Sequence, residues 1–299
     1  MKLIRRLFGI WLLWRLFGPT LRPRFTPPQE HPWRLSGRTV FVGDEEFLIR
    51  DAGPEEGDPV LLIHGLGGSS LSEWYQVAPK LAAERRVILV DHRSHGLSPI
   101  IAERFEVEDV ADDIVGVLDA LGIGRVAVVG YSMGGAIAQT IANRHPGRVS
   151  KLVLIAAFAT HTGAVGWIRK AGALVTRAWE RLTGTGTPEV RSTYLLGVGA
   201  VQRKHARWLW EETHRRNTEA GAEATLALLR FDSTDWVGRL DVETLVVIPT
   251  EDQLVPPRWQ YHLAGLISGA KVVEIPGARH EVVWTHPDRV SEAIGSFLD

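Results

Sequence analysis

The chain has 299 residues, with 34 Lys and Arg against 35 Asp and Glu, 11 Trp and no Cys. This length fits one large domain or two small ones and is enough to bury a core without cross-links. The lack of cysteine excludes disulfides, thiolate metal sites and a thiol nucleophile. The formal net charge of −1 argues against nucleic acid as the main partner.

The N-terminus is basic and apolar. Residues 1–24 hold six of the 34 cations and no acid, so the remaining residues carry 28 cations and all 35 acids. The apolar run 7–14 is shorter than the roughly 20 residues that span a bilayer. Basic residues near one helical face suit a helix in the membrane interface, so we expect peripheral membrane contact through residues 1–18.

Other interpretations of this segment remain open. It can be a helix packed on its own domain or on a partner, or an uncleaved export signal, since no small-residue cleavage site follows. The expected location is therefore membrane-associated or cytoplasmic. Prolines between residues 19 and 32 indicate a linker, so residues 1–38 are expected to precede the folded core.

From residue 39 onward, strand and helix patterns alternate. Residues 39–53 predict a β-hairpin around Gly43 and Asp44. Short apolar runs predict buried parallel strands at 59–65, 85–92, 125–132, 151–157, 244–252 and 270–277. Helical patterns lie at 107–123, 133–149, 257–268 and 287–298. This alternation predicts an α/β fold whose mainly parallel sheet has helices on both faces.

Residues 160–232 interrupt the alternation, because they are helical, rich in Trp and Arg, and contain no convincing strand. Their position predicts an inserted helical cap, or lid, over the carboxyl ends of the strands, where ligands bind in open α/β sheets. The core would then comprise residues 39–159 and 233–299. Four tryptophans of this region either line an apolar acyl pocket or pack the helices together: Trp167, Trp179, Trp208 and Trp210.

A candidate nucleophile lies where an apolar strand ends and a helix begins. Residues 130–134, Gly-Tyr-Ser-Met-Gly, fit the pattern G-x-S-x-G, whose glycines permit a sharp turn that exposes the Ser132 hydroxyl. The alternative is a glycine turn with an incidental serine. A serine hydroxyl needs a base, and His280, after the last predicted strand, can reach this edge of the sheet.

The base needs an orienting carboxylate. Asp252 follows the penultimate strand, and its neighbour Glu251 is the competing candidate. Two backbone N–H groups are expected to stabilise the oxyanion that acyl transfer generates. We assign these to Met133, after the nucleophile, and to Leu66, in the glycine-rich residues 64–68. A phosphate-binding loop is the alternative for that run, but it lacks the G-x-G-x-x-G spacing and the P-loop lysine.

These segments together resemble the α/β-hydrolase superfamily, and within it the capped serine esterases and lipases. The resemblance covers residues 39–299 and rests on HGLGGSS, DHRSHGLS, GYSMGG, TEDQLVP and ARHEVVWTHP, in the order typical of the family. It implies an eight-stranded type of sheet, a catalytic triad of Ser132, Asp252 and His280, a cap and no cofactor. Ser94 and Arg279 stand where the family commonly has glycine.

The predicted function is hydrolysis of a carboxylic ester, apolar or lipid-like, through an acyl-enzyme. Its partner would be a small-molecule ester, and no His, Asp and Glu spacing resembles a metal site. The same triad also serves hydrolysis of a C–C bond in a dienoate, thioester hydrolysis and acyl transfer. A non-catalytic ligand receptor on the hydrolase fold is a further alternative. The oligomeric state is left open.

Adjacent carboxylates occur at Glu55-Glu56, Asp112-Asp113 and Glu211-Glu212, among other places. Neighbours along a helix do not share a face. We therefore expect these residues to be solvated rather than to form an acid–base pair.

Overall fold

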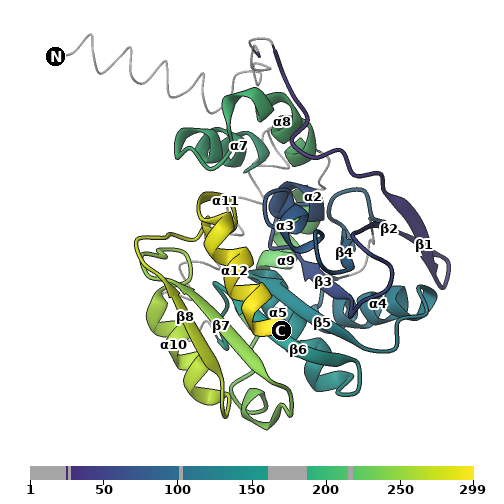
Figure 1. The fold of residues 1–299 in the computed structure, drawn as a ribbon, viewed down its shortest axis with the longest axis vertical. Coiled ribbons are helices and arrows are strands. Elements are labelled where there is room, and N and C mark those ends of the chain that lie inside the picture. The colour runs from purple at the N-terminus through teal and green to yellow at the C-terminus, as the bar shows by residue number, and fades with distance from the viewer. Residues whose placement is uncertain (1–24, 26–27, 101–103, 161–186, 215–217) are drawn as a thin grey trace.

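A computed structural model of the chain describes residues 25, 28–100, 104–160, 187–214 and 218–299 (Figure 1). Within these residues eight strands form one sheet, in the order β1-β2-β4-β3-β5-β6-β7-β8. The strands are β1 (Arg38–Val42), β2 (Glu45–Ala52), β3 (Val60–Ile63), β4 (Val87–Val90), β5 (Val126–Tyr131), β6 (Val149–Ile155), β7 (Thr244–Pro249) and β8 (Lys271–Ile275).

The sheet confirms the predicted hairpin and the mainly parallel strand pairing. Strands β1 and β2 form the antiparallel hairpin, and Gly43 adopts a φ of 60° in its turn. Strand β2 pairs with β4 in antiparallel fashion, whereas β3 to β8 pair with one another in parallel. All residues of β3 and β4 are buried, as expected for parallel strands covered on both faces.

Helices cover both faces of the sheet. Successive side chains of a strand point to opposite faces, so each buried strand contributes to a core on either side. In β3, Leu61 and Ile63 join one buried cluster, whereas Val60 and Leu62 join the other. The first cluster includes residues of α4 (Val107–Ala120), α5 (Met133–Arg144) and α10 (Pro257–Leu266); the second includes residues of α2 (Ser70–Trp74), α3 (Ala78–Leu81), α11 (Val282–Thr285) and α12 (Pro287–Leu298).

The long helices of the core were predicted from the sequence, but α2, α3 and α11 were not. These three helices have five, four and four residues. Segments this short complete little more than one turn, so their apolar residues show no helical period. They follow β3 and β8, at the edge of the sheet where the parallel strands end.

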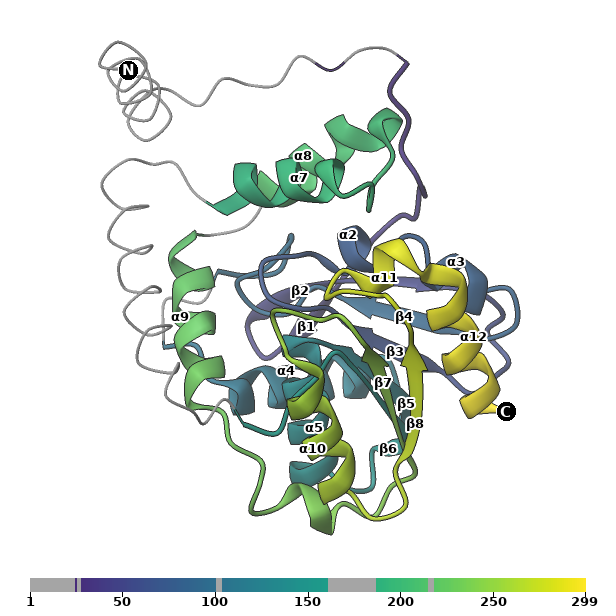
Figure 2. The ribbon, with the colours of Figure 1, turned by 90° about the vertical axis from the view of Figure 1, so that its left-hand side faces the viewer.

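The chain segment from Thr160 to Asp232, here called the insert, contributes four described elements: α7 (Thr187–Gly197), the 3₁₀ helix η1 (Arg203–His205), α8 (Ala206–His214) and α9 (Thr218–Arg230). In Figure 2, α7 and α8 lie across the end of the core that carries α2 and α11. This is the carboxyl edge of the parallel strands, as expected for a cap. The remainder of the predicted cap, including Trp167 and Trp179, lies outside the described residues.

The two ends of the insert meet at the core. Thr160 and Asp232 form an isolated antiparallel bridge. The Thr160 hydroxyl donates to the Asp232 carboxylate at 3.0 Å, and the Ser233 N–H donates to the Ala159 carbonyl at 2.9 Å. A second 3₁₀ helix, η2 (Val237–Arg239), then leads into β7. The chain thus leaves and re-enters the core at neighbouring points.

The described part of the predicted N-terminal linker packs along the insert. The Glu30 N–H donates to the Lys204 carbonyl at 2.8 Å, and the Glu30 carbonyl lies 2.9 Å from His205 Nδ1. Trp208 is buried against Tyr75, with ring centroids 4.9 Å apart, so this tryptophan packs the insert onto the core. The predicted interfacial helix, residues 1–18, lies outside the described residues, and no helix within them is long and apolar enough to cross a membrane.

The expectation of solvated carboxylates is wrong for Asp113 and Glu212. The Asp113 side chain is only 13% exposed and accepts two hydrogen bonds from Arg93, at 2.5 and 2.7 Å. Glu212 is buried and accepts from the Ser69 hydroxyl at 2.8 Å. Adjacent helical residues point in different directions, so one member of each pair faces the packed side of its helix.

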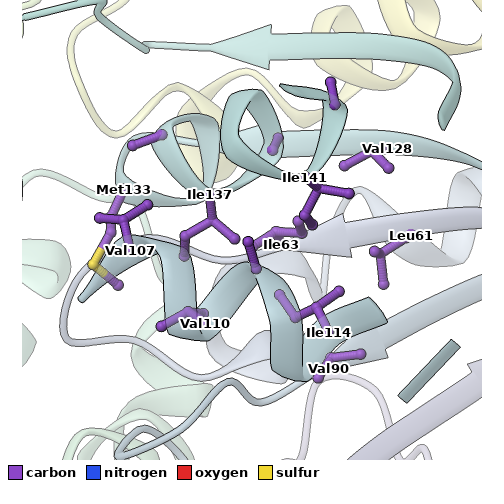
Figure 3. Close-up of a cluster of buried hydrophobic side chains, with 14 of the residues drawn as sticks. Leu61, Ile63, Val90, Val107, Val110, Ile114, Val128, Met133, Ile137 and Ile141 are labelled. Atoms are coloured by element: carbon purple, nitrogen blue, oxygen red, sulfur yellow. The ribbon is translucent and has the colours of Figure 1, made fainter. Parts of the chain in front are cut away.

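Packing between α4 and α5 holds the nucleophile's helix against the sheet. Figure 3 shows isoleucines and valines of the two helices gathered around Ile63 of β3, with Leu61 to one side. We predict that Ile114→Ala, which truncates a buried residue of α4, lowers the free energy of unfolding by about 2–5 kcal/mol. Ile100→Ala is the control, because Ile100 is 66% exposed. Denaturant unfolding curves that coincide for the two variants would contradict this prediction.

Candidate active site

Ser132 occupies a strained turn between β5 and α5. Its φ is 54° and its ψ is −115°, a conformation that residues with a side chain rarely adopt. The Ser132 N–H donates to the Ile155 carbonyl of β6 at 2.9 Å. The helix that follows begins at once with Met133. The turn therefore directs the side chain away from the regular sheet, as the motif predicts.

The glycines of the motif are required by close approaches. A Cβ atom on Gly130 would lie 2.2 Å from the Gly134 carbonyl oxygen, and one on Gly134 would lie 2.2 Å from the Ile63 carbonyl oxygen. Both distances are far shorter than any tolerated contact. The backbones of β3, β5 and α5 can thus approach one another only because these positions lack side chains.

His280 lies between Ser132 and Asp252. Its Nε2 is 3.0 Å from the Ser132 hydroxyl oxygen, and its Nδ1 is 2.8 Å from Oδ2 of Asp252. When Nδ1–H donates to the carboxylate, Nε2 is left as the acceptor for the serine hydroxyl. The structure therefore brings together the three residues that the sequence singled out.

Asp252 rather than Glu251 contacts His280, because the two residues point in different directions. The Asp252 side chain is buried, and its Oδ1 accepts the backbone N–H groups of Leu254 and Val255, each at 2.8 Å. Glu251 is exposed. The Gln260 amide, from α10, donates to Oδ2 of Asp252 at 3.2 Å. These bonds fix the carboxylate in the orientation that holds the imidazole.

Tyr131 and Gln260 support this arrangement, and the sequence reasoning missed both. Tyr131 is buried next to Ser132 in the chain, and its hydroxyl donates to the main-chain carbonyl of His280 at 2.7 Å, which holds the loop that carries His280. Burial raises the pKa of Tyr131 well above its usual value, which keeps this donor protonated. Tyr131 stood at a variable position of the motif, and only the folded chain places Gln260 next to Asp252.

The proposed oxyanion donors are the N–H groups of Met133 and Leu66. Met133 is the first residue of α5, so its N–H has no acceptor within the helix and lies at the positive end of the helix dipole. Gly65 packs against the nucleophile, since a Cβ placed on it would be 3.2 Å from that of Ser132. The Gly65 N–H already donates to Glu73, at 2.5 Å. The next amide along the chain is that of Leu66, whose role stays a prediction.

Glu73 is a buried carboxylate beside this site that sequence reasoning also missed. Its side chain is 1% exposed and forms an ion pair with Arg191 of α7, with Nη2 and Oε1 2.5 Å apart. Burial raises the pKa of Glu73, and Arg191 opposes this shift. Gly68 makes room for the carboxylate, because a Cβ there would lie 2.2 Å from Oε1. A single glutamate in the run before Trp74 carries no recognisable signal.

Three other histidines, His64, His92 and His95, form a buried cluster next to the carboxyl ends of β3 and β4. The rings of His64 and His92 are stacked with centroids 3.8 Å apart, and His95 lies 4.2 Å from His92. Burial lowers the pKa of His92 to about 4 and that of His64 well below its usual value, so both are neutral near pH 7. No group of three or more potential ligand side chains within the described residues could hold a metal ion.

Comparison with known proteins identifies the family of this chain. Residues 58–287 match the family described as the alpha/beta hydrolase fold. The chain belongs to the α/β-hydrolase family. This confirms the predicted fold class and identifies the chain as an enzyme of the hydrolase class, with the eight-stranded, mainly parallel sheet expected for it.

Relatives within this α/β-hydrolase family have several named activities. A protein of Caulobacter vibrioides with the provisional name carbamate hydrolase RutD is 31% identical over 278 residues, which cover 88% of this chain and 99% of that protein. A 2-hydroxymuconate semialdehyde hydrolase of Pseudomonas is 30% identical over 286 residues, covering 91% and 96%. The structure of a thermophilic esterase from Thermogutta terrifontis has a TM-score of 0.74 and 26% identity, covering 88% and 98%.

The close approach at Gly134 gives a direct test of the turn. We predict that Gly134→Ala destabilises this hydrolase by about 1–3 kcal/mol or more, since the new methyl group meets the Ile63 carbonyl. The control is Gly147→Ala, because a Cβ on Gly147 has no heavy atom within 4 Å. Thermal unfolding would measure both variants, and equal midpoints would refute the steric explanation.

Proposed function

We propose that this α/β-hydrolase cleaves a carboxylic ester through an acyl-enzyme formed on Ser132. The observation that carries the proposal is the continuous hydrogen-bonded series from Ser132 through His280 to the buried Asp252. A nucleophile, a base at hydrogen-bond distance and a third group that orients the base are the arrangement that activates a serine hydroxyl. No cofactor is needed for this chemistry.

The first half-reaction forms the acyl-enzyme. His280 Nε2 takes the hydroxyl proton as the Ser132 oxygen attacks the carbonyl carbon, and Asp252 stabilises the resulting imidazolium. The N–H groups of Met133 and Leu66 donate to the oxyanion of the tetrahedral intermediate. When the intermediate collapses, the C–O bond to the alcohol breaks and His280 gives its proton to the departing oxygen.

The second half-reaction regenerates the enzyme. Water attacks the acyl carbon while His280 accepts one of its protons, and the carboxylic acid leaves as the proton returns to the Ser132 oxygen. The strained turn at Ser132 supports both steps, because it keeps the hydroxyl oxygen close to Nε2 and beside the first amide of α5. The alcohol and the acid are the two products.

An apolar ester is the proposed substrate class. Its support is the basic and apolar N-terminal segment together with the similarity to an esterase at 26% identity. The relative named 2-hydroxymuconate semialdehyde hydrolase favours a second candidate, C–C cleavage of a dienoate. A dienoate acid needs a cation for its carboxylate, and Arg191 of the insert already donates to Leu66 and Glu73. The ester therefore remains the first proposal.

Removal of the nucleophile tests the mechanism. Ser132→Ala is expected to lower kcat on p-nitrophenyl esters by about ten-thousand-fold or more and to abolish labelling by a fluorophosphonate. Ser291→Ala is the matched control, since that hydroxyl bonds only to the main chain of its own helix among the contacts described. Ester hydrolysis by Ser132→Ala at the wild-type rate would overturn the assignment.

Substrate class is tested by comparing kcat/KM on p-nitrophenyl esters of increasing acyl length, on an aryl carbamate and on a dienoate. We expect the esters to be turned over fastest, with a preference for longer acyl chains. A dienoate turned over faster than every ester would replace the first proposal with C–C hydrolysis. Turnover of none of them, together with no labelling of Ser132, would favour a ligand receptor on the hydrolase fold.

We further propose that residues 1–18 place the enzyme on anionic lipid. Clustered cations near an apolar segment are each worth on the order of 1 kcal/mol at such a surface. Replacing Arg5 and Arg6 by Gln is expected to weaken co-sedimentation with phosphatidylserine vesicles, while hydrolysis of a soluble short ester is unchanged. Replacement of Arg38 and Arg239, cations outside this segment, is the control. Vesicle binding that is insensitive to the Arg5 and Arg6 changes and to salt would contradict this proposal.

A further inference from the structure

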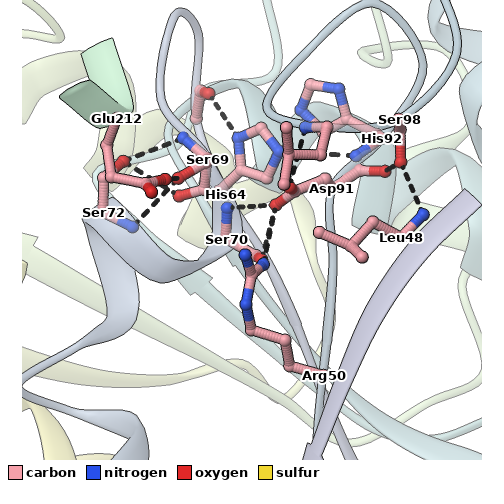
Figure 4. Close-up of polar contacts among 12 residues, drawn as sticks. Leu48, Arg50, His64, Ser69, Ser70, Ser72, Asp91, His92, Ser98 and Glu212 are labelled. Carbon is pink, nitrogen blue, oxygen red and sulfur yellow. Dashed lines mark hydrogen bonds and ion pairs between the residues drawn. The ribbon is translucent and has the colours of Figure 1, made fainter. Parts of the chain in front are cut away.

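The loop between β3 and α2, residues 64–69, is held by contacts from the insert. This β3–α2 loop carries the proposed oxyanion donor Leu66 and packs against Ser132 through Gly65. From α7, Arg191 Nη1 donates to the Leu66 carbonyl at 2.6 Å. From α8, Glu212 accepts a hydrogen bond from Ser69, as Figure 4 shows. Two helices of the insert thus contact a loop that adjoins the nucleophile.

Arg191 is also linked, through Glu73, to the residue that precedes Leu66. Its Nη2 donates to Oε1 of Glu73 at 2.5 Å, while Oε2 of Glu73 accepts the Gly65 N–H at 2.5 Å. Along the main chain, the Leu66 N–H lies between the Gly65 N–H and the Leu66 carbonyl. Both flanking groups are therefore fixed by one ion pair.

A third bond sets the direction of the amide itself. The Gly65 carbonyl oxygen lies 2.9 Å from His64 Nδ1. This carbonyl and the Leu66 N–H belong to the same planar peptide group and point in opposite directions. Fixing the direction of the Gly65 carbonyl therefore fixes the direction of the Leu66 N–H. The contacts of Arg191 and Glu73 hold the position of this peptide group next to Ser132.

The ion pair is built so that it forms only when α7 is docked. Glu73 belongs to the core and is buried, whereas Arg191 belongs to the insert and also packs its guanidinium over the Trp284 ring, 5.6 Å from the centroid. Without Arg191, Glu73 would remain a buried carboxylate without its counter-charge, which is costly. The free energy of this pair thus favours the docked insert and the ordered loop together.

We infer that Arg191 is a positioning residue, which couples docking of the insert to the orientation of the Leu66 amide and so completes the oxyanion hole. The inference rests on the proposed function, in which that amide stabilises the tetrahedral intermediate. Arg191 does not contact the reacting atoms in this assignment. It acts through Glu73 and through the Leu66 carbonyl.

The test compares Arg191→Gln, Glu73→Gln and the double variant with the wild-type enzyme on a p-nitrophenyl ester. Loss of one oxyanion donor costs about a hundred- to a thousand-fold in kcat, so a misplaced donor should cost about ten- to a hundred-fold. KM should change little. Affinity for a trifluoromethyl ketone, which forms an oxyanion on the serine, should fall in parallel with kcat. The double variant should resemble Arg191→Gln, because removal of Arg191 already breaks both the ion pair with Glu73 and the bond to the Leu66 carbonyl.

Arg230→Gln is the matched control. Arg230, at the end of α9, also pairs an insert cation with a core carboxylate, Glu106, at 3.0 Å, but neither residue contacts the β3–α2 loop in the contacts described. This variant should keep the wild-type kcat and inhibitor affinity. Arg191→Lys keeps a positive charge but not the paired donors, and it serves as the test if Arg191→Gln does not fold.

The inference is overturned if folded Arg191 variants lose thermal stability but keep both kcat and ketone affinity, since Arg191 would then be structural only. It is equally overturned if the Arg230 control loses as much activity as Arg191→Gln. Failure of the proposed function has a different signature, because the wild-type protein would then neither hydrolyse esters nor label at Ser132. That result would overturn both the proposed function and the inference about Arg191.

Discussion

The backbone turn at Ser132 is the constraint on which the rest of the site depends. A residue with a side chain in such a conformation costs on the order of 1–3 kcal/mol and persists only where its surroundings enforce it. Here β5 enters the turn from the middle of a buried sheet, and α5 leaves it packed against α4. The strain is maintained by both elements, so the hydroxyl cannot relax away from His280 without displacing part of the core.

The partners of Ser132 come from segments that the sheet brings to one edge. Asp252 follows β7 and His280 follows β8, and these two strands are neighbours in parallel. The chain separation between Ser132 and His280 is 148 residues, yet their side chains form a hydrogen bond. Parallel strands end at the same side of a sheet, so a short loop after each one is enough to bring these three side chains together. Ser132, His280 and Asp252 all belong to the core, and the insert contributes only further contacts at this edge of the sheet.

The sequence was sufficient for the sheet, the long helices and the grouping of Ser132, His280 and Asp252, because each of these leaves a local pattern of hydrophobicity, glycine or turn residues. The sequence did not predict the roles of Glu73, Arg191 and Glu212, because these roles depend on contacts between residues far apart in the chain. Arg191 and Glu73, for example, are 118 positions apart. Single charges of this kind look like surface residues until the fold is known. Ser94 is an intermediate case, since its φ of 63° explains why glycine is common there in the family.

The adjacency of Thr160 and Asp232 has a consequence for how this protein can vary. The core already holds these two residues together, so the segment between them is a loop with neighbouring ends. The length of this loop hardly affects the conformational entropy lost when the sheet forms. Each doubling of such a loop adds only about 0.6 kcal/mol. Helices could be exchanged, lengthened or removed there while the strand order and its hydrogen-bond register stay intact. One core can in this way carry different insert helices over the same serine. The molecules that reach Ser132 can therefore change in evolution while the sheet and helices that hold Ser132 stay the same.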